Sequence, residues 1–412
     1  MQLEALQRAK DFSSIGYRVF HSEEIYERER THIFAGNVWN YVCLDIEVPE
    51  PGSFITTYVG DIPVLVNRTM EGGLKAFENR CMHRGTKLKR EARGKETTHN
   101  CVYHQWCYGL DGGLIGIPFA RGKDGKGGVP AEFDRSSIKL REMKLSILKG
   151  VVFGSFGDNP PPLEDYLGPR VVEMIENLFY KPIKILGYQR QRIMGNWKLY
   201  NENVRDTNHG GLLHMFHATF GLASLSMQGG SRLDGPTRGH NTSYTVYGTD
   251  DQSQKKDGYS QTKKVLQDTF QLADPSMLRF EKELPREESL VILSTFPNGV
   301  FQQISNSLCT RQIRPRGVNE MELYWTYYGF EDDTPEMTEH RRNQANLVGP
   351  GGLVSMEDGE AVQLVHEETK ASPEAASRII IGGLGEIKDT ESLITEVPLR
   401  GFWASYFKAM DL

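Results

Sequence analysis

Short stretches of β-branched and aromatic residues, separated by turns that contain glycine, dominate the chain after its first 38 residues. They comprise residues 41–44, 53–59, 63–67 and 146–156. Val, Ile, Thr, Tyr and Phe favour strands. The pattern therefore predicts a small antiparallel β-domain that runs to about Phe156.

The first 38 residues have a different pattern, because they are charged and predict helix. Ser22 is followed by Glu23 and Glu24. A serine before two acidic residues is typical of a helix N-terminus, where a hydroxyl caps free backbone N–H groups and negative charge is favourable. We expect a helix from Ser22 to Phe34.

The remainder of the chain alternates strand and helix patterns. Strands are expected at residues 183–192, 289–296, 300–304, 307–313 and 322–330. Helices are expected at residues 171–178, around residue 209, from Pro335 to Val348, and after the glycine-rich residues 349–352. This alternation predicts an α+β domain.

Asp158-Asn159-Pro160-Pro161-Pro162 interrupts the pattern and marks a domain boundary. We therefore expect domains at residues 39–157 and 158–412, with the helical segment 1–38 packed on the second. The polar stretch 249–258 is expected to form a loop over a pocket.

Composition restricts the function. The chain has 412 residues, five cysteines and a formal net charge of −6. The charge disfavours nucleic acid as a partner, and no apolar run reaches the roughly 20 residues of a membrane span. The N-terminus lacks the apolar core of a signal peptide, and the few, unevenly placed cysteines fit a reducing compartment. These features predict a cytoplasmic protein.

Two cysteines and two histidines form the strongest chemical signal. The order is Cys81-x-His83, seventeen residues, then Cys101-x-x-His104. Such a set can hold tetrahedral zinc or a Rieske [2Fe–2S] cluster, in which two cysteines bind one iron and two histidines bind the other. Each segment supplies one cysteine and one histidine, and this interleaving favours the cluster.

A second candidate metal site lies at His209 and His214, with Asp206 three residues before the first histidine. A helix loosened by Gly210-Gly211 is expected to turn both imidazoles toward one ion. Two histidines and a carboxylate with open positions hold non-haem Fe(II). Glu357 and Asp358 are both candidates for the third ligand. A histidine pair by itself more often makes only local hydrogen bonds.

Together these motifs resemble the large (α) subunit of Rieske non-haem iron aromatic-ring-hydroxylating oxygenases over nearly the whole length. The likeness rests on the Cys/His motif, on Asn196-Trp197-Lys198 leading into the histidine pair, and on Gly349-Pro350 before Glu357-Asp358-Gly359. It implies an N-terminal Rieske domain and a C-terminal helix-grip-like domain with a central antiparallel sheet surrounded by helices.

The resemblance also implies residue roles. The cluster ligands would be Cys81, His83, Cys101 and His104, and the iron ligands would be His209, His214 and Asp358. Asp206 would bridge His104 of one subunit to His209 of its neighbour, in an α3 trimer or an α3β3 hexamer with a small β subunit. Electrons would come from NADH through a separate reductase, with or without a ferredoxin, because the chain has no dinucleotide fingerprint of its own.

Within the family, the likeness is to members that act on aromatic carboxylates such as salicylate, anthranilate, terephthalate and halobenzoates. The segments "MGNWKLYNENV", "LLHMFHATF" and "RGFW" carry it. Arg311 and Arg400 are the expected carboxylate ligands, since arginine binds carboxylates with paired hydrogen bonds; a structural ion pair is the alternative for each. Asn203 and His217 are the other expected substrate residues.

The expected function is hydroxylation of the ring of an aromatic carboxylate with O2. A neutral aromatic hydrocarbon as substrate, a non-catalytic Rieske electron carrier and a zinc scaffold are the alternatives. The chain departs from the family pattern at Asn208, where many members have tyrosine, and at Gln105, where glycine is common. Neither position is an expected ligand.

Overall fold

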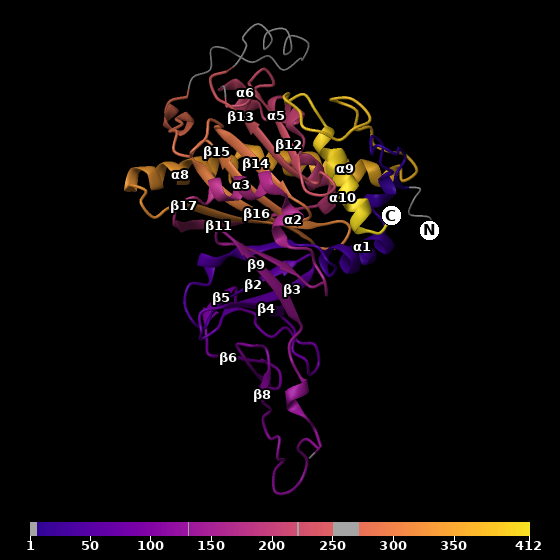
Figure 1. Cartoon of the computed structure of the whole chain (residues 1–412), viewed down its shortest axis with the longest axis vertical. Coiled ribbons are helices and arrows are strands. Elements are labelled where there is room, and N and C mark those ends of the chain that lie inside the picture. Colours follow the sequence, from indigo (N-terminus) through magenta and orange to yellow (C-terminus); the bar gives the residue numbers. More distant parts are fainter. Residues whose placement is uncertain (1–5, 131, 221, 250–271) are drawn as a thin grey trace. The chain divides into compact units, whose positions relative to one another are not determined.

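The computed structural model describes residues 6–130, 132–220, 222–249 and 272–412, which divide into two compact units (Figure 1). Phe34–Pro160 forms one unit, and the segment that ends at Ile33 joins Pro161–Leu412 in the other. Of the polar stretch 249–258, all but Thr249 lies outside the described residues. The antiparallel β-domain and the α+β domain expected from the sequence are both present.

The Phe34–Pro160 unit contains two antiparallel sheets. A seven-stranded sheet has the order β1-β10-β9-β4-β3-β2-β5, and a three-stranded sheet has the order β6-β7-β8. The strands are β1 Asn40–Leu44, β2 Ser53–Val59, β3 Ile62–Arg68, β4 Leu74–Glu78, β5 Arg93–Lys95, β6 Thr98–Asn100, β7 Cys107–Gly109, β8 Leu114–Gly116, β9 Glu142–Leu148 and β10 Val151–Ser155. All the strands expected in this region are confirmed, and the Cys/His motif lies in the loops that follow β4 and β6.

The larger unit is built on one seven-stranded antiparallel sheet, in the order β11-β17-β16-β15-β14-β13-β12. Its strands are β11 Ile183–Ile193, β12 Gly229–Asp234, β13 His240–Thr245, β14 Leu290–Thr295, β15 Gly299–Ile304, β16 Ser307–Pro315 and β17 Met321–Phe330. Every residue of β15 is buried, so both faces of the sheet centre are covered.

Helices surround this sheet (Figure 1). They are α1 Glu23–Glu29, α2 Leu163–Leu167, α3 Pro169–Leu178, α4 Trp197–Asn203, α5 Thr207–Leu213, α6 Met215–Thr219, α8 Pro335–Val348, α9 Leu353–Ala371 and α10 Val397–Ala409. The Ser22 hydroxyl caps α1 by accepting from Ile25 N, as expected, and a π-helical turn continues the chain to Phe34. Helix α10 was not expected from the sequence.

A buried carboxylate ties three of these helices together. Glu29 on α1 accepts hydrogen bonds from Trp197 Nε1 at 2.7 Å, Lys198 Nζ at 2.6 Å and Tyr406 Oη at 2.6 Å. The Glu29 and Lys198 side chains are 0% and 1% exposed. Because a buried charge is tolerated only when it is paired, this cluster fixes α4, which leads directly into the histidine pair.

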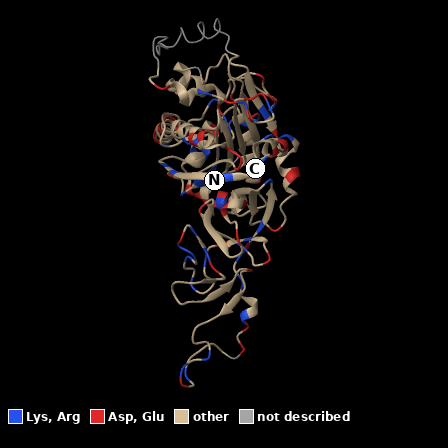
Figure 2. Ribbon diagram, turned by 90° about the vertical axis from the view of Figure 1, so that its left-hand side faces the viewer, with Lys and Arg blue, Asp and Glu red and all other residues tan. Residues whose placement is uncertain are grey.

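Lysine and arginine are interspersed with aspartate and glutamate in each unit (Figure 2). Among the described residues, none of the helices has the length and apolar character needed to cross a membrane.

Candidate functional site

Two similar turns bring the Cys/His motif together in the β-domain. In each turn the residue four after the cysteine donates its backbone N–H to the cysteine carbonyl: Gly85 to Cys81 at 3.0 Å, and Gln105 to Cys101 at 2.9 Å. Both cysteines are buried. The rings of His83 and His104 lie 4.6 Å apart, centroid to centroid.

This donor set fits a [2Fe–2S] cluster, because two thiols and two imidazoles converge and His83 Nδ1 is buried without a hydrogen-bond partner among the described residues. Trp106 stacks on His83 with the ring planes 5° apart, which holds that imidazole in place. Gln105 has φ 58°, in the left-handed region that favours glycine. That geometry explains why glycine is common at this position in the family.

Tyr108 is a functional candidate that the motif did not reveal. Met82 N donates to Tyr108 Oη at 3.0 Å, and Tyr108 Oη lies 3.3 Å from Cys81 Sγ. Since the tyrosine oxygen already accepts from Met82, its own hydrogen is free to be donated to the sulfur. Burial raises the pKa of the Cys81 thiol. A hydrogen bond to a cluster sulfur influences the reduction potential.

Of the histidine pair in the second motif, His209 lies on one short helix and His214 lies at the break before the next, so no single bent helix carries both. Helix α5 ends at Leu213 and α6 begins at Met215, with His214 between them at φ −82° and ψ 80°. The expectation of a bend at Gly210-Gly211 is therefore wrong, because the break falls at His214. The non-helical backbone of His214 directs its ring toward that of His209, 5.2 Å away between centroids.

Asp206 is the N-cap of α5, not a residue on its face. Its Oδ1 accepts from Asn208 N at 2.8 Å and from His209 N at 3.3 Å. Its Oδ2 lies 3.6 Å from His209 Nδ1. The same carboxylate thus begins the helix and sits behind the first imidazole.

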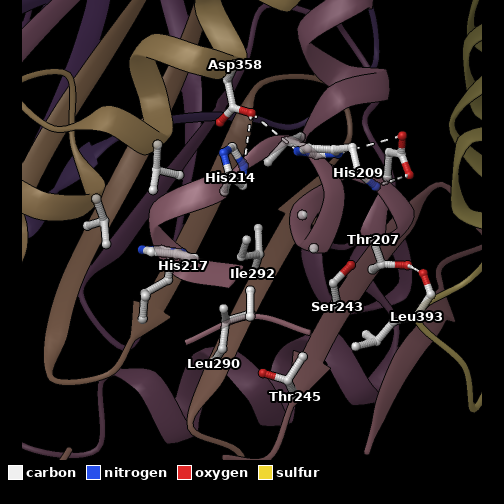
Figure 3. Close-up of a pocket in the computed structure, with 18 of the residues that line it drawn as sticks. Thr207, His209, His214, His217, Ser243, Thr245, Leu290, Ile292, Asp358 and Leu393 are labelled. Atoms are coloured by element: carbon white, nitrogen blue, oxygen red, sulfur yellow. Dashed lines mark hydrogen bonds and ion pairs between the residues drawn. The ribbon is translucent and has the colours of Figure 1, made fainter. Parts of the chain in front are cut away.

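His209, His214 and Asp358 bring three donor atoms to within 4.8 Å of one another. Asp358 Oδ1 lies 3.3 Å from His209 Nε2 and 3.4 Å from His214 Nε2 (Figure 3). Both imidazoles therefore present Nε2 to the same carboxylate. Two imidazoles and one carboxylate form the facial donor set that non-haem Fe(II) prefers.

Glu357, the other candidate for third ligand, has a different position. Its Oε2 lies 2.8 Å from His214 Nδ1, on the opposite side of the ring from Asp358. A carboxylate at the outer nitrogen fixes the tautomer and orientation of a metal-binding histidine. Asn203, expected at the substrate, donates to Asp358 Oδ1 at 3.1 Å and so orients that carboxylate.

The electrostatics of the triad favour a cation. Burial opposes charge on His209, but the adjacent Asp206 and Asp358 carboxylates raise its pKa to about 10. The pKa of Asp358 is lowered in spite of burial, because His209 and His214 are close. The carboxylates that stabilise the positively charged imidazole would stabilise a metal cation at the same place, and metal binding there would release the proton.

A pocket extends from the triad to the sheet (Figure 3). Its lining includes apolar residues of several elements, namely Leu225, Leu290, Ile292, Ile304, Val348 and Val354. His217, Gln302 and Arg311 also line it. The pocket is therefore a mainly apolar space with the candidate metal centre at its edge, as is typical of small-molecule sites.

Arg311 on β16 is held in this pocket by two hydrogen bonds. It donates from Nη1 to Tyr200 Oη at 2.6 Å and from Nη2 to Gln302 Oε1. Its Nε and the Gln302 Nε2 are buried and find no hydrogen-bond partner among the described residues. Gln302 was not expected as a site residue from the sequence. The feature that could have indicated it is a polar residue within a strand that is otherwise typical of a buried one.

Arg400 is not brought to this pocket. It lies on α10, donates to Gly385 O at 2.8 Å, and has Asp11 Oδ2 3.5 Å away. Its expected role as a substrate ligand does not fit this position, because its guanidinium is engaged by a carbonyl and a carboxylate elsewhere in the unit. His217, in contrast, lines the pocket as expected.

Comparison with known families matches the chain in two segments. Residues 38–130 match the Rieske [2Fe-2S] domain, and residues 182–410 match the ring hydroxylating alpha subunit (catalytic domain). These segments contain the two Cys/His turns and the His/His/Asp triad, respectively.

Relatives match along almost the whole chain. The anthranilate 1,2-dioxygenase large subunit of Burkholderia cepacia is 42% identical, with 97% of this chain and 94% of the relative covered. The terephthalate 1,2-dioxygenase terminal oxygenase component subunit alpha 2 of Comamonas sp. is 41% identical, with 93% and 92% covered. The salicylate 5-hydroxylase large oxygenase component of Ralstonia sp. is 37% identical, with 97% and 94% covered.

The fold is that of naphthalene 1,2-dioxygenase from Rhodococcus sp., with a TM-score of 0.80 at 21% identity, covering 99% of this chain and 96% of that one. With both domain matches and with relatives above 30% identity over nearly the full length, the chain belongs to the α subunits of the Rieske ring-hydroxylating oxygenases, a family of oxidoreductases.

Proposed function

We propose that this chain is the terminal oxygenase component that hydroxylates the ring of an aromatic carboxylate with O2. One observation carries the proposal: the pocket that begins at His209, His214 and Asp358 also contains Arg311, whose buried Nε has no partner among the described residues. The named substrates of the three relatives, anthranilate, terephthalate and salicylate, are all benzene carboxylates.

His209, His214 and Asp358 would hold Fe(II), and Cys81, His83, Cys101 and His104 would hold the [2Fe–2S] cluster. When bound, the iron supplies oxygen activation and the cluster supplies one-electron transfer. Glu357 and Asn203 keep the ligands oriented from behind, at His214 Nδ1 and Asp358 Oδ1.

Arg311 and Gln302 would bind the substrate carboxylate. Because Gln302 Oε1 accepts from Arg311 Nη2, its amide nitrogen is left to donate. Arg311 Nε and Gln302 Nε2, which have no partner among the described residues, would then be two donors for one carboxylate. Charge-assisted hydrogen bonds of this kind are about twice as strong as neutral ones. The apolar residues of β14 and α9 exclude water around the ring.

In the proposed assembly three α subunits form a ring, as an α3 trimer or with β subunits as α3β3. Asp206 would then lie between His209 and His104 of the partner subunit, orienting both imidazoles. NADH would supply electrons through a separate reductase, with or without a ferredoxin, in the cytoplasm. The cluster domain would span residues 39–157 and the iron domain residues 158–412, with the segment 1–38 packed on the latter.

Product analysis tests the proposal. The purified oxygenase, coupled to a reductase, is supplied with labelled O2 and a panel of benzoates, anthranilate, salicylate, terephthalate and neutral arenes. Labelled oxygen in the product of an acid, and none from the arenes, is the expected result. Turnover of neutral arenes alone would support an oxygenase function but would contradict an aromatic carboxylate as the substrate.

The same preparation separates the remaining alternatives. A zinc scaffold would be colourless, whereas a Rieske cluster gives broad visible absorption. An electron carrier without catalysis would show no oxygen uptake on addition of Fe(II) and substrate.

A further inference from the structure

His217 lines the pocket and carries a polar atom without a hydrogen-bond partner among the described residues. It lies on α6, three residues after His214, and is 3% exposed. Its Nε2 is buried and has no hydrogen-bond partner in the part of the chain that the structure describes. Leaving such a group unpaired costs about 1–3 kcal/mol, so an imidazole here is unfavourable unless something in the filled pocket pairs with it.

The metal centre does not account for this imidazole. Within the described residues, the donor atoms that gather within 4.8 Å are those of His209, His214 and Asp358, without His217. The His217 ring meets the His214 ring edge-on at a centroid distance of 6.1 Å. Figure 3 shows His217 between His214 and Leu290, beside the pocket. Its partner is therefore to be sought in the pocket itself.

The charge of the pocket restricts that partner. Among the described residues that line the pocket, Arg311 is the only lysine or arginine. One carboxylate of a substrate can pair with it, but a second buried carboxylate would find no further lysine or arginine in the lining, and an unpaired buried charge is costly. A hydroxyl or amino group has no such requirement. A ring hydroxyl donates and accepts, so it can pair with His217 Nε2 in either tautomer, and a ring amino group can donate to Nε2 when that nitrogen carries no hydrogen.

We propose that His217 Nε2 hydrogen-bonds an uncharged hydroxyl or amino substituent on the ring of the aromatic acid, while Arg311 binds its carboxylate. The inference rests on the proposed function and narrows it to monocarboxylates with a second polar group. His217 is then a specificity-determining residue, because a site with a buried hydrogen-bonding group discriminates strongly against an analogue that lacks the matching group.

Binding measurements test this directly. The iron-loaded oxygenase is titrated anaerobically with benzoate, with the hydroxy- and aminobenzoate isomers, and with 1,4-benzenedicarboxylate. His217→Leu has a similar volume without a polar atom, and His217→Gln keeps a donor and an acceptor. The control is Thr245→Val, since Thr245 on β13 lines another wall of the pocket and its Oγ1 also has no hydrogen-bond partner among the described residues.

We expect His217→Leu to weaken binding of the preferred hydroxy- or aminobenzoate about tenfold and to change benzoate binding less than twofold. His217→Gln should restore part of the loss. Iron content should equal that of the wild type in all variants, because His217 is not among the triad. Thr245→Val should retain the wild-type preference for the substituted acid.

Several results would overturn the inference. Equal weakening of benzoate and of the substituted acid by His217→Leu would leave only a packing role, and loss of iron would make His217 part of the metal site. A preference abolished by Thr245→Val but not by His217→Leu would place the substituent at β13. Tightest binding of the dicarboxylate would contradict the charge argument.

Failure of the proposed function gives a different result. If the wild type binds none of these acids, both the proposed function and this inference are wrong. If it binds benzoate in an Arg311-dependent manner but His217→Leu does not distinguish the acids, the proposed function stands and only the inference fails.

Discussion

Replacement of Arg311 offers the most direct test of how the pocket recognises its substrate. Arg311 is 4% exposed, and its Cζ lies 4.8 Å from the Trp325 ring centroid. The charge of Arg311 is thus shielded from bulk water where the residue lines the pocket. We expect Arg311→Met, which keeps the length and removes the charge, to weaken binding of a carboxylate substrate.

The size of the effect follows from burial. Removing one partner of a buried ion pair costs about 3–5 kcal/mol, because the other charge is left unpaired. At about 1.4 kcal/mol per factor of ten, this corresponds to a rise in KM or Kd of roughly 150- to 5,000-fold. A neutral analogue of similar shape has no charge to leave unpaired, so its binding should change only a few-fold.

The assay compares an aromatic acid with the corresponding amide in wild type, Arg311→Met and Arg311→Lys. Arg311→Lys keeps the charge but not the planar array of donors, so an intermediate loss is expected. Arg311→Met also leaves Tyr200 Oη and Gln302 Oε1 without their donor. Thermal unfolding therefore serves as a control for stability. Equal losses for acid and amide would refute the reasoning.

Three further predictions concern other parts of the chain. Asp206→Asn keeps an N-cap for α5 but removes the negative charge beside His209. Turnover should fall by about 10- to 100-fold or more, while the iron and sulfide contents stay at wild-type levels. Full activity of this variant would exclude an electron-relay role for Asp206. Tyr108→Phe removes the hydroxyl that lies 3.3 Å from Cys81 Sγ. The midpoint potential of the cluster should fall by about 40 mV, which is about 1 kcal/mol for one electron. An unchanged potential would contradict a hydrogen bond from Tyr108 to the sulfur. His240 accepts from Phe296 N at 3.1 Å and lies 2.8 Å from Tyr166 O. Burial lowers the pKa of His240 from 6.5 to about 4, although the hydrogen bond to Tyr166 O opposes this shift. Below pH 6.5 the unfolded chain protonates this histidine, whereas the folded chain does not, so the free energy of unfolding decreases by about 1.4 kcal/mol for each unit that the pH falls, down to about pH 4. Urea unfolding at pH 7.5 and 5.5 should show that His240→Gln reduces this pH dependence by about 1.4 kcal/mol. An identical pH dependence in the variant would assign it to other groups.

The sequence by itself determined the parts that depend on local chemistry. The two cysteines and two histidines at 81–104 lie on two short turns, so their interleaved spacing alone was enough to favour a cluster over zinc. Ser22 caps α1 because an N-cap needs only a hydroxyl three residues before a free N–H. The strands of both sheets were predictable from β-branched and aromatic runs. The family resemblance added the choice of Asp358, which the residues alone left open.

Only the tertiary structure decided which side chains meet. Consecutive residues on a helix point about 100° apart, so the rotation of α9 alone sends Asp358 to the Nε2 atoms and Glu357 to His214 Nδ1. Arg311 and Arg400 were both expected at the substrate carboxylate, but Arg311 lies on a central strand beside the pocket, whereas Arg400 lies on α10 and donates to Gly385 O. Gln302 became a candidate substrate ligand, and His217 stayed one, because both line the pocket and the Nε2 atom of each has no hydrogen-bond partner among the described residues. Whether a buried polar atom finds a hydrogen-bond partner depends on segments that are far apart in the chain, so a local sequence pattern does not predict it.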